Sequence, residues 1–457
     1  MGIINKIRGW FSMLTKSKAI EEFNIEPIGS QQMKNWVNEC VNIYQGNPCW
    51  IDEDDNIDSI NFAKAICSEV ARLATLSIGI KVDGSKRADW LQEQVDRVYF
   101  QLRNWVEYGC AYGTIILKPN GESIDLYTPD MFETVHVTND KIDGVVFHNW
   151  KKENKKWYTR LEYHRFEDGL YRISNKCYIG DKPDNTNERI DIAATPWDYL
   201  SEEVGISNMK DTLFGVFRTP QANNIDMSSP YGLPIFSEAV QELRDLDIAY
   251  SRNSKEIKDS KRTILLDSER LLPNGTEGNL SRVNMPDYIR IVDGDTSVES
   301  DIYHEINPEL NTDVRLTGIN ALLSQIGYKA GFSNGYFVFN ETTGIQTATQ
   351  VEADQQRTIQ LVKDVRDKLE SCLNGVIYAL DVFASLYKTA PSGKYEIAYD
   401  FGDITYSREE DRARWWGYVQ AGNVPAWMFF MKFEGMTEEE AKAMTEEAQP
   451  KQTTLFT

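Results

Sequence analysis

The stretch PIFSEAVQELRDLDIAYSRNSKEIKDSKR, residues 234–262, carries the most information about the fold. Pro234 suits the first position of a helix, where its missing N–H removes no hydrogen bond. Apolar residues recur every three or four positions through the first half, at Phe236, Val240, Leu243 and Leu246. From Ser251 onward the stretch is polar. The pattern therefore predicts a helix of about 28 residues, about 40 Å long, whose second half leaves the core.

The second half of this stretch is basic, although the chain as a whole is acidic. Its charges give a local net of +3, from Arg252, Lys255, Lys258, Lys261 and Arg262 against Glu256 and Asp259. The 457-residue chain has 49 Lys and Arg against 70 Asp and Glu, a net charge of −21. This acidity argues against tight nonspecific DNA binding, which depends on neutralising phosphates, but it is compatible with contact to DNA that slides.

A compact insert and a second helix follow. Residues 263–305 contain short β-like runs and a Pro-Asn-Gly turn, which predict a small β-rich insert. Asn307 and Pro308 are typical of an N-cap and a first helical position, so we expect a second helix to about Ile326. The sequence therefore predicts two helices that bracket a small insert.

The N-terminal part changes from helical to β-like patterning near residue 110. A helix over 88–110 is predicted by apolar residues at helical spacing, Leu91, Val95, Val98, Leu102, Trp105 and Val106. Residues 111–180 predict an antiparallel β region with tight turns at Asn120-Gly121 and Asp168-Gly169. Residues 181–234 are rich in turn residues and predict loops.

The C-terminal part is dominated by one very long helix. Residues 328–346, YKAGFSNGYFVFNETTGIQ, are rich in Gly and aromatic residues and predict a prominent loop with a β-like YFVF run. An apolar rhythm then predicts a helix over 347–388, about 60 Å long. A strand near 395–399 and short capped helices complete a chain of the α+β class. The expected capping pairs are Thr347 with Gln350 or Thr349 with Glu352, Ser407 with Glu410, and Thr437 with Glu440.

Motifs of enzymes are incomplete in this sequence. Gly331-Phe-Ser333-Asn-Gly335 matches G-x-S-x-G, but the expected order of elements is wrong for a hydrolase and the last histidine, His304, precedes the serine. Asp400-Phe401-Gly402 spells the kinase magnesium motif without the other kinase motifs. The acidic stretch 52–63 lacks the Gly and Glu that a calcium loop needs. We therefore expect no enzymatic activity, no metal and no cofactor.

The cysteines indicate a reducing, cytosolic compartment, and the hydropathy indicates that no segment spans a membrane. Six cysteines without a CxxC pair predict reduced, mostly buried thiols rather than a disulfide scaffold or a zinc site. No apolar run approaches the roughly 18 residues that cross a bilayer, so no membrane span is expected. Residues 1–24 form a basic amphipathic segment without the features of a signal peptide. They predict a surface helix packed on the body of the protein, and the alternative is a helix that lies on a membrane surface.

Three stretches, in this order, carry a resemblance to a known family. They are 229–236 leading to 246–250, then 328–332 leading to Gly344-Ile-Gln-Thr-Ala-Thr-Gln-Val351, then 403–411 followed by 421–425 and 437–442. Together they resemble the portal proteins of tailed bacteriophages, especially those of siphovirus-like phages of Gram-positive hosts. Gln350 stands where this family usually has Glu.

The resemblance implies a function in the virion. It implies a homo-oligomeric ring, usually of twelve subunits, at one capsid vertex. Double-stranded DNA is packaged through such a ring by the terminase motor and later ejected. The implied partners are the terminase large subunit, a head–tail adaptor protein, and the major capsid and scaffolding proteins. The implied location is the capsid portal vertex, and the host cytoplasm during assembly, with no membrane partner.

The resemblance also implies a division of the chain. It assigns 1–24 to an N-terminal segment, 25–234 to an α/β wing, 235–262 and 306–327 to two stem helices, 263–305 to a β-rich clip, 328–346 to a tunnel loop, 347–400 to a long wing helix and its return strand, and 401–457 to a helical crown. The portal fold expected here is thus a variant of the α+β class.

Two residue sets are candidates for contact with DNA. The stem set is Lys255, Lys258, Lys261 and Arg262, and the alternative is that these cations pair with acidic residues across a subunit interface. The tunnel-loop set is Lys329, Asn334, Tyr336, Phe337, Phe339 and Asn340, and the alternative is a β segment packed in the core. The alternative functions are another oligomeric phage head or connector component, and a serine hydrolase built on Ser333.

Overall fold

A computed structural model gives the fold. It describes residues 18–53, 57–121, 123–182, 188–260, 263–267, 289–292, 303–306, 312–338, 348–402, 408–422 and 424–447. Helices and strands are mixed, with 48% helix and 23% strand, which confirms the α+β class. The chain divides into two compact units, of which the second comprises residues 76–79 and 400–457.

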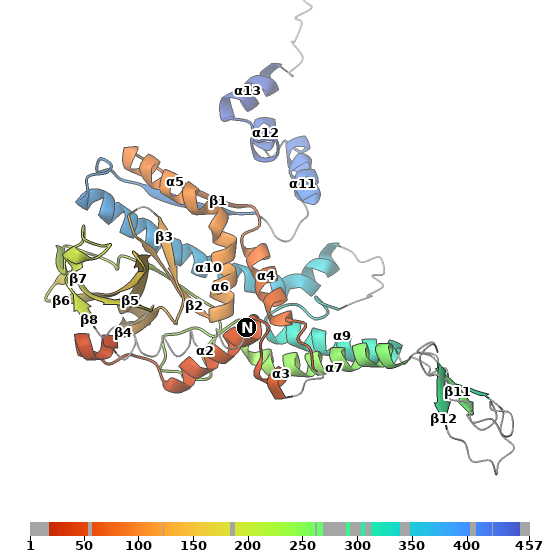
Figure 1. Cartoon of the computed structure of the whole chain (residues 1–457). Helices are drawn as coiled ribbons and strands as arrows, with labels where there is room; N and C mark the ends of the chain where they lie inside the picture. Colours follow the sequence, from red (N-terminus) through yellow and green to blue (C-terminus); the bar gives the residue numbers. More distant parts are fainter. Residues whose placement is uncertain are drawn as a thin grey trace, which may run out of the picture. The chain divides into compact units, whose positions relative to one another are not determined.

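A six-stranded antiparallel sheet forms one part of the first unit (Figure 1). Its strands are β4 (Phe132–Thr138), β5 (Lys141–Glu153), β6 (Lys156–Glu167), β7 (Leu170–Gly180), β8 (Glu188–Ile190) and β9 (Glu203–Ser207). The order is β4-β5-β6-β7-β8, with β9 also paired to β7. Two-residue turns with positive φ connect β4 to β5, β5 to β6 and β6 to β7, at Asn139-Asp140, Asn154-Lys155 and Asp168-Gly169 respectively. The predicted β region is confirmed.

A three-stranded sheet lies at the centre of this unit. Its order is β10 (Gly215–Arg218), β2 (Thr114–Pro119) and β3 (Ile124–Tyr127). Gly121, with φ +98°, turns β2 into β3 as predicted. The described part of 181–234 is rich in turns and loops as predicted, and it also contains the short strands β8, β9 and β10. Strands of three to five residues are too short to show a clear alternation.

The long helix α10 (Ala348–Leu386) packs on the central sheet, and its prediction is confirmed. At its contact with β10, a Cβ on Gly215 would come within 2.0 Å of the Cys372 carbonyl oxygen, so only glycine fits. Within the described residues, one helical stretch, Gln355–Leu386, is long and apolar enough to cross a membrane. Its apolar side is buried in the core, at Val362, Val365, Leu369, Leu373 and Val376.

The N-terminal helices are α2 (Gln31–Tyr44), α3 (Cys49–Glu53), α4 (Phe62–Ala74), α5 (Lys86–Val98) and α6 (Leu102–Tyr112). Of these, α4 and α5 contact α10, and α4 also packs against α6. A short 3-10 turn, η1 (Tyr99–Gln101), separates α5 from α6, so the predicted helix over 88–110 is confirmed with an interruption. All six of its apolar marker residues are buried.

Two further helices bracket a small sheet in the sequence. The elements are η3 (Ser237–Ala239), α7 (Val240–Asp259), β11 (Thr263–Asp267), β12 (Ile289–Val292), β13 (Tyr303–Ile306) and α9 (Thr312–Lys329). β11 pairs parallel with β12 and antiparallel with β13. The expected helix start at Pro234 was wrong. Pro234–Ala239 forms tight turns, with the Ser237 N–H donating to the Pro234 carbonyl at 2.9 Å. Asn307 and Pro308 lie outside the described residues.

The second unit consists mainly of α11 (Arg408–Gln420), α12 (Ala426–Glu434) and α13 (Glu438–Glu447). The predicted capping box at α13 is confirmed, because the Thr437 N–H donates to Glu440 at 3.0 Å and the Glu440 N–H donates to Thr437 Oγ1 at 3.4 Å. Two further strands, β1 (Ile78–Asp83) and β14 (Glu396–Phe401), pair with each other. Of the other expected capping residues, Thr347 and Ser407 lie outside the described residues, and Thr349 is the second residue of α10 rather than its N-cap.

Candidate functional site

The helices α7 and α9 form an antiparallel pair, side by side in Figure 1. Glu242 accepts a hydrogen bond from Lys329 Nζ at 2.5 Å, and Glu256 forms an ion pair with Arg315. The two contacts are 256 − 242 = 14 residues apart on α7 and 329 − 315 = 14 residues apart on α9. Equal spacing in opposite directions fixes the register over about 21 Å of helix.

The first half of α7 is anchored to the N-terminal helices. The Asp247 carboxylate is buried and accepts hydrogen bonds from Trp50 Nε1 at 2.9 Å and from the Ile60 N–H at 3.1 Å. Burial raises the pKa of this carboxyl. One turn later, Ser251 Oγ accepts a hydrogen bond from the Asp58 N–H at 2.9 Å. These contacts hold α7 at a fixed place on the body of the unit.

Beyond Ser251, α7 presents cations to solvent. Arg252, Lys255 and Lys258 are exposed, and none of the described residues forms an ion pair with them. The nearby Glu256 is occupied by Arg315, so it does not neutralise them. Lys261 and Arg262, which were expected to belong to the same set, lie outside the described residues. The described part of the stem set is therefore two positive charges, Lys255 and Lys258, and the exposed Arg252 lies beside them on α7.

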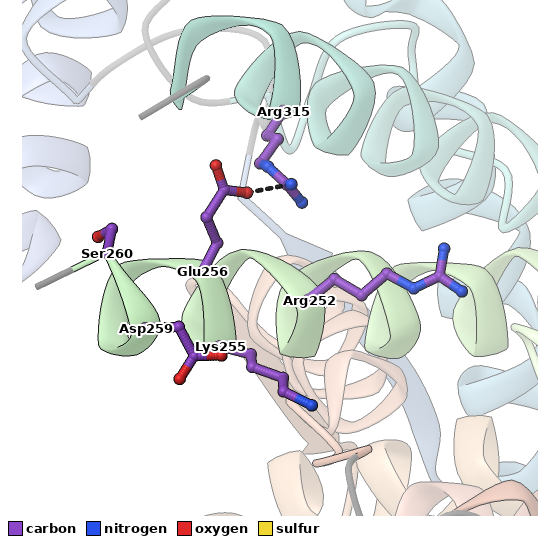
Figure 2. A pocket seen from close by; sticks show the side chains of 6 residues that line it. All are labelled: Arg252, Lys255, Glu256, Asp259, Ser260 and Arg315. Atoms are coloured by element: carbon purple, nitrogen blue, oxygen red, sulfur yellow. Dashed lines mark ion pairs between the residues drawn. The ribbon is translucent and has the colours of Figure 1, made fainter. Parts of the chain in front are cut away.

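A shallow hollow of about 480 Å³ lies along this half of α7 (Figure 2). It is lined by Arg252, Lys255, Glu256, Asp259, Ser260 and Arg315. Figure 2 shows Glu256 turned toward Arg315, whereas Arg252 and Lys255 extend away from that pair. Arg252, Lys255 and Asp259 follow i, i+3, i+7 spacing and share one helix face. This face of α7 therefore carries two cations, Arg252 and Lys255, and one carboxylate, Asp259.

The segment 330–338, which follows α9, is folded against the body. Phe332 is fully buried, and Ser333 Oγ lies 3.0 Å from Thr358 Oγ1 of α10. The expected β-like run was wrong for its described part. The Tyr336 and Val338 N–H groups donate to carbonyls three residues earlier, at 3.3 and 3.1 Å, which makes consecutive turns instead of a strand.

The described tunnel-loop candidates have different surroundings. Lys329 is paired with Glu242 of α7. Tyr336 donates its hydroxyl proton to Glu69 of α4, and burial raises the Tyr336 pKa to about 12. Phe337 packs edge-on against Phe62, with ring centroids 5.2 Å apart.

The remaining candidates of this set are Asn334, Phe339 and Asn340. Asn334 is exposed and is hydrogen-bonded to Ser324 of α9. Phe339 and Asn340 lie outside the described residues. Tyr336 and Phe337 thus both contact side chains of α4. Lys329, at the end of α9, and Asn334, in the turn that follows, contact α7 and α9 instead.

A contact that the sequence did not indicate joins α9 to α10. The guanidinium of Arg357 stacks 3.7 Å from the ring centre of Tyr328, and its Nη2 donates to the Tyr328 carbonyl at 2.8 Å. The two residues lie 29 positions apart, beyond any helical or turn spacing, so no local pattern marks them. Together with the Glu242–Lys329 pair, this contact ties α7, α9 and α10 to one another.

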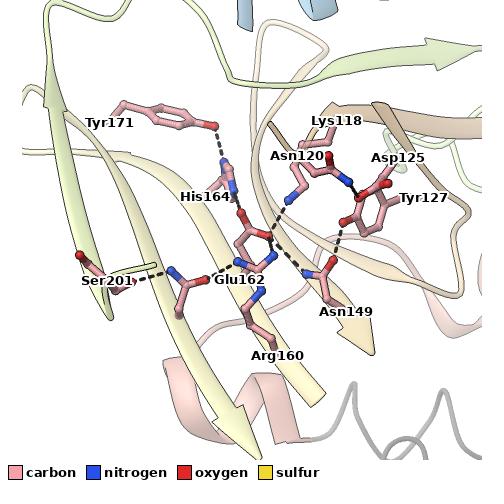
Figure 3. A network of polar contacts seen from close by, with 11 residues as sticks. Lys118, Asn120, Asp125, Tyr127, Asn149, Arg160, Glu162, His164, Tyr171 and Ser201 are labelled. Atoms are coloured by element: carbon pink, nitrogen blue, oxygen red, sulfur yellow. Dashed lines mark hydrogen bonds and ion pairs between the residues drawn. The ribbon is translucent and has the colours of Figure 1, made fainter. Parts of the chain in front are cut away.

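A second group of charged residues is buried between β2 and the six-stranded sheet (Figure 3). Glu162 accepts from Lys118 Nζ at 2.5 Å, from Arg160 at 2.9 Å and from His164 Nε2 at 2.9 Å. His164 Nδ1 lies 2.8 Å from the hydroxyl of Tyr171. We call these five residues the buried charge network. Because Glu162 contacts Lys118 of β2 as well as Arg160 and His164 of β6, the network holds these strands together.

The pKa values in this network follow from burial and from the two cations. Burial opposes ionisation of Glu162, but Arg160 and Lys118 outweigh it and hold its pKa well below the usual range. Burial lowers the pKa of His164, so the imidazole is neutral near pH 7. His136, His148 and His164 all lie in the six-stranded sheet.

All six cysteines are free, and five of them are buried, whereas Cys49 is exposed. Among the described residues, no group of three His, Cys, Asp or Glu side chains is arranged to hold a metal ion. The groups that the α7–α9 pair offers to a ligand are thus exposed ammonium and guanidinium groups, which bind phosphates and carboxylates. No known protein-family model matches the chain, and no curated protein matches it.

Proposed function

We propose that this chain is the subunit of a portal ring, through which double-stranded DNA enters and leaves a phage capsid. The observation that carries the proposal is the α7–α9 pair. Two antiparallel helices in fixed register bracket a three-stranded sheet in the sequence, and one of them presents cations without partners among the described residues. This order of elements corresponds to the stem, clip and stem that the resemblance implies.

The charge distribution supports DNA that passes without being held. A net charge of −21 on each subunit repels a polyanion, which keeps contacts with the channel wall brief. Arg252, Lys255 and Lys258 then make transient contacts with phosphates. Because Asp247 and Glu242 fix α7 on the body, these cations are held at a defined position in each subunit.

The proposal includes the partners that such a ring needs. The terminase large subunit drives the DNA inward, and a head–tail adaptor protein binds the ring afterwards. The major capsid and scaffolding proteins assemble around it at one vertex, in the host cytoplasm and then in the virion. The chain itself supplies no chemistry in this proposal, since the motor provides the energy.

The test is the mass and shape of the purified chain. Native mass spectrometry with negative-stain images is expected to show a closed ring with a central channel, near twelve times 52.4 kDa. A monomer or compact dimer at every salt and protein concentration would contradict the proposal. A ring without DNA translocation in a packaging assay would instead favour another head or connector component.

A further inference from the structure

The turn between β5 and β6 is a second basic and exposed feature of the described chain, outside the α7–α9 pair. Residues 151–156, KKENKK, contain four lysines and one glutamate, a net charge of +3 in a chain of −21. All six residues are exposed. We call them the basic hairpin tip. Asn154 and Lys155 have φ values of +49° and +66°, typical of a tight two-residue turn at the end of a paired ladder.

Aromatic rings hold two of these lysines in place. Lys151 Nζ lies 5.4 Å from the ring centre of Trp197 and 6.0 Å from that of Tyr199. Lys152 Nζ lies 5.4 Å from the ring centre of Trp157. Contacts of this kind are attractive and restrict the long side chains before any partner binds.

The positive charge of the tip is mostly uncompensated. Lys156 pairs with Asp181 at 2.7 Å. No ion pair joins Lys151, Lys152 or Lys155 to any residue in the described part of the chain. The end of one hairpin therefore carries three exposed lysines without an ion-pair partner in the described structure, with Lys151 and Lys152 on opposite faces of β5.

We propose that the basic hairpin tip docks a short, carboxylate-rich segment of a partner protein. Charge complementarity selects an anionic partner. The screening length in physiological salt is about 8 Å, so a short segment is attracted by the local net charge of +3 and is little affected by more distant charges. A long polyanion would also meet the acidic remainder of the chain, which repels it. This inference does not depend on the proposed portal function.

The aromatic residues favour a protein partner over nucleic acid. Trp197 is buried, and it lies close to both Lys151 and the Arg160 guanidinium, which is 5.2 Å from its ring centre. The Trp157 ring is covered by Lys152. These two rings do not offer the open faces on which bases stack in single-strand binding sites, and Tyr199, which is 68% exposed, offers one ring rather than the series on which successive bases stack.

The experiment measures binding of two probes to the full chain by fluorescence anisotropy, at 50 and 150 mM salt. The probes are a labelled decaglutamate peptide and a labelled duplex of twenty base pairs. The test variant is K151E/K152E/K155E. The matched control is K86E/K363E/K394E, which changes the net charge equally at exposed lysines on α5, on α10 and before β14. Circular dichroism and the urea midpoint of each variant verify folding.

We expect the wild type and the control to bind the peptide alike, and the tip variant to bind at least tenfold more weakly. The duplex is expected to bind more weakly than the peptide. Equal losses in the tip variant and the control would overturn the proposal, because net charge alone would then account for binding. Tip-dependent binding of the duplex in preference to the peptide would also overturn it and assign the tip to nucleic acid.

Discussion

Charged residues of the same types occur in two opposite environments in this chain. In the buried charge network, Lys118, Arg160 and Glu162 are only 3%, 7% and 7% exposed, and the carboxylate contacts both cations. On the outer half of α7, Lys255 and Lys258 are exposed and have no ion-pair partner among the described residues. The first group is complete within one chain, whereas the second is not.

This difference separates structural from functional charge. A buried charge without a partner costs several kcal/mol, so the fold must supply the partner itself. An exposed charge costs almost nothing, so its position is free to be set by a molecule outside the chain. The comparison predicts that substitutions in the network change the stability of the chain. Substitutions of the exposed cations of α7 should change only its interactions with other molecules.

The largest effect is expected for Glu162→Gln. It removes the one carboxylate between Lys118 and Arg160, and leaves two buried cations uncompensated. We expect the free energy of unfolding to fall by about 3–5 kcal/mol, measured by urea denaturation. Glu153→Gln, at the exposed end of β5, is the control and is expected to change stability by less than about 0.5 kcal/mol. Equal effects of the two would break the comparison.

A double-mutant cycle tests whether the network acts as a unit. Lys118→Met removes one cation and leaves Glu162 bonded to Arg160 and His164, so we expect a loss of about 1–3 kcal/mol. Combined with Glu162→Gln, the loss should be smaller than the sum by about 0.5–3 kcal/mol, since each change removes a group that the other leaves unpaired. Strict additivity would show that the two charges do not interact.

The pH dependence of stability tests the buried imidazole. Because the folded pKa of His164 is lowered by burial, the unfolded chain binds a proton below about pH 6.5 that the folded chain does not. Stability should therefore fall as the pH falls from 7 to 5, by at most about 1.4 kcal/mol per pH unit from this group. Glu162 adds to the fall only below about pH 4.5.

His164→Gln isolates this contribution. Glutamine retains a donor toward Glu162 and an acceptor toward the Tyr171 hydroxyl, and it does not titrate. Urea midpoints between pH 5 and 7 should vary less in this variant than in the wild type. The same pH slope in both chains would mean that His164 is not buried neutral.

The sequence predicted elements whose signals are local. The hairpin at Asn120-Gly121, the long helix α10 and the capping box at Thr437 each depend on residues within a few positions or on a repeated spacing. Short strands such as β8, with three residues, have too few positions to alternate. The 3-10 turn η3 was missed because its residues also fit a helical pattern.

The contacts of the candidate site were not predictable, because they join distant parts of the chain. Lys118 and Glu162 are 44 positions apart, and Lys329 and Glu242 are 87 positions apart. Which face of a strand or helix carries the charge depends on a register that only the folded chain defines. The sequence did indicate the basic half of α7, because a cluster of like charges is visible without a register.

The smallest effect on stability, and the clearest effect on function, is expected for R252A/K255A/K258A. These side chains are exposed and lack ion-pair partners in the described structure, so each change should alter the free energy of unfolding by less than about 0.5 kcal/mol. If they contact phosphates, DNA packaging by assembled rings should be several-fold slower and less dependent on salt. The control is K86A/K363A/K394A, which removes the same charge elsewhere.

The oligomeric state of this variant decides between the two roles of the α7 cations. Intact rings with slow packaging support contact with DNA. If the cations instead pair with carboxylates of a neighbouring subunit, the rings should dissociate at lower salt than those of the wild type, because one partner of each interfacial ion pair has been removed. Intact rings that package at the wild-type rate would contradict both roles. The exposed cations of α7 would then contribute neither to stability, as the buried network does, nor to contact with DNA or a neighbouring subunit.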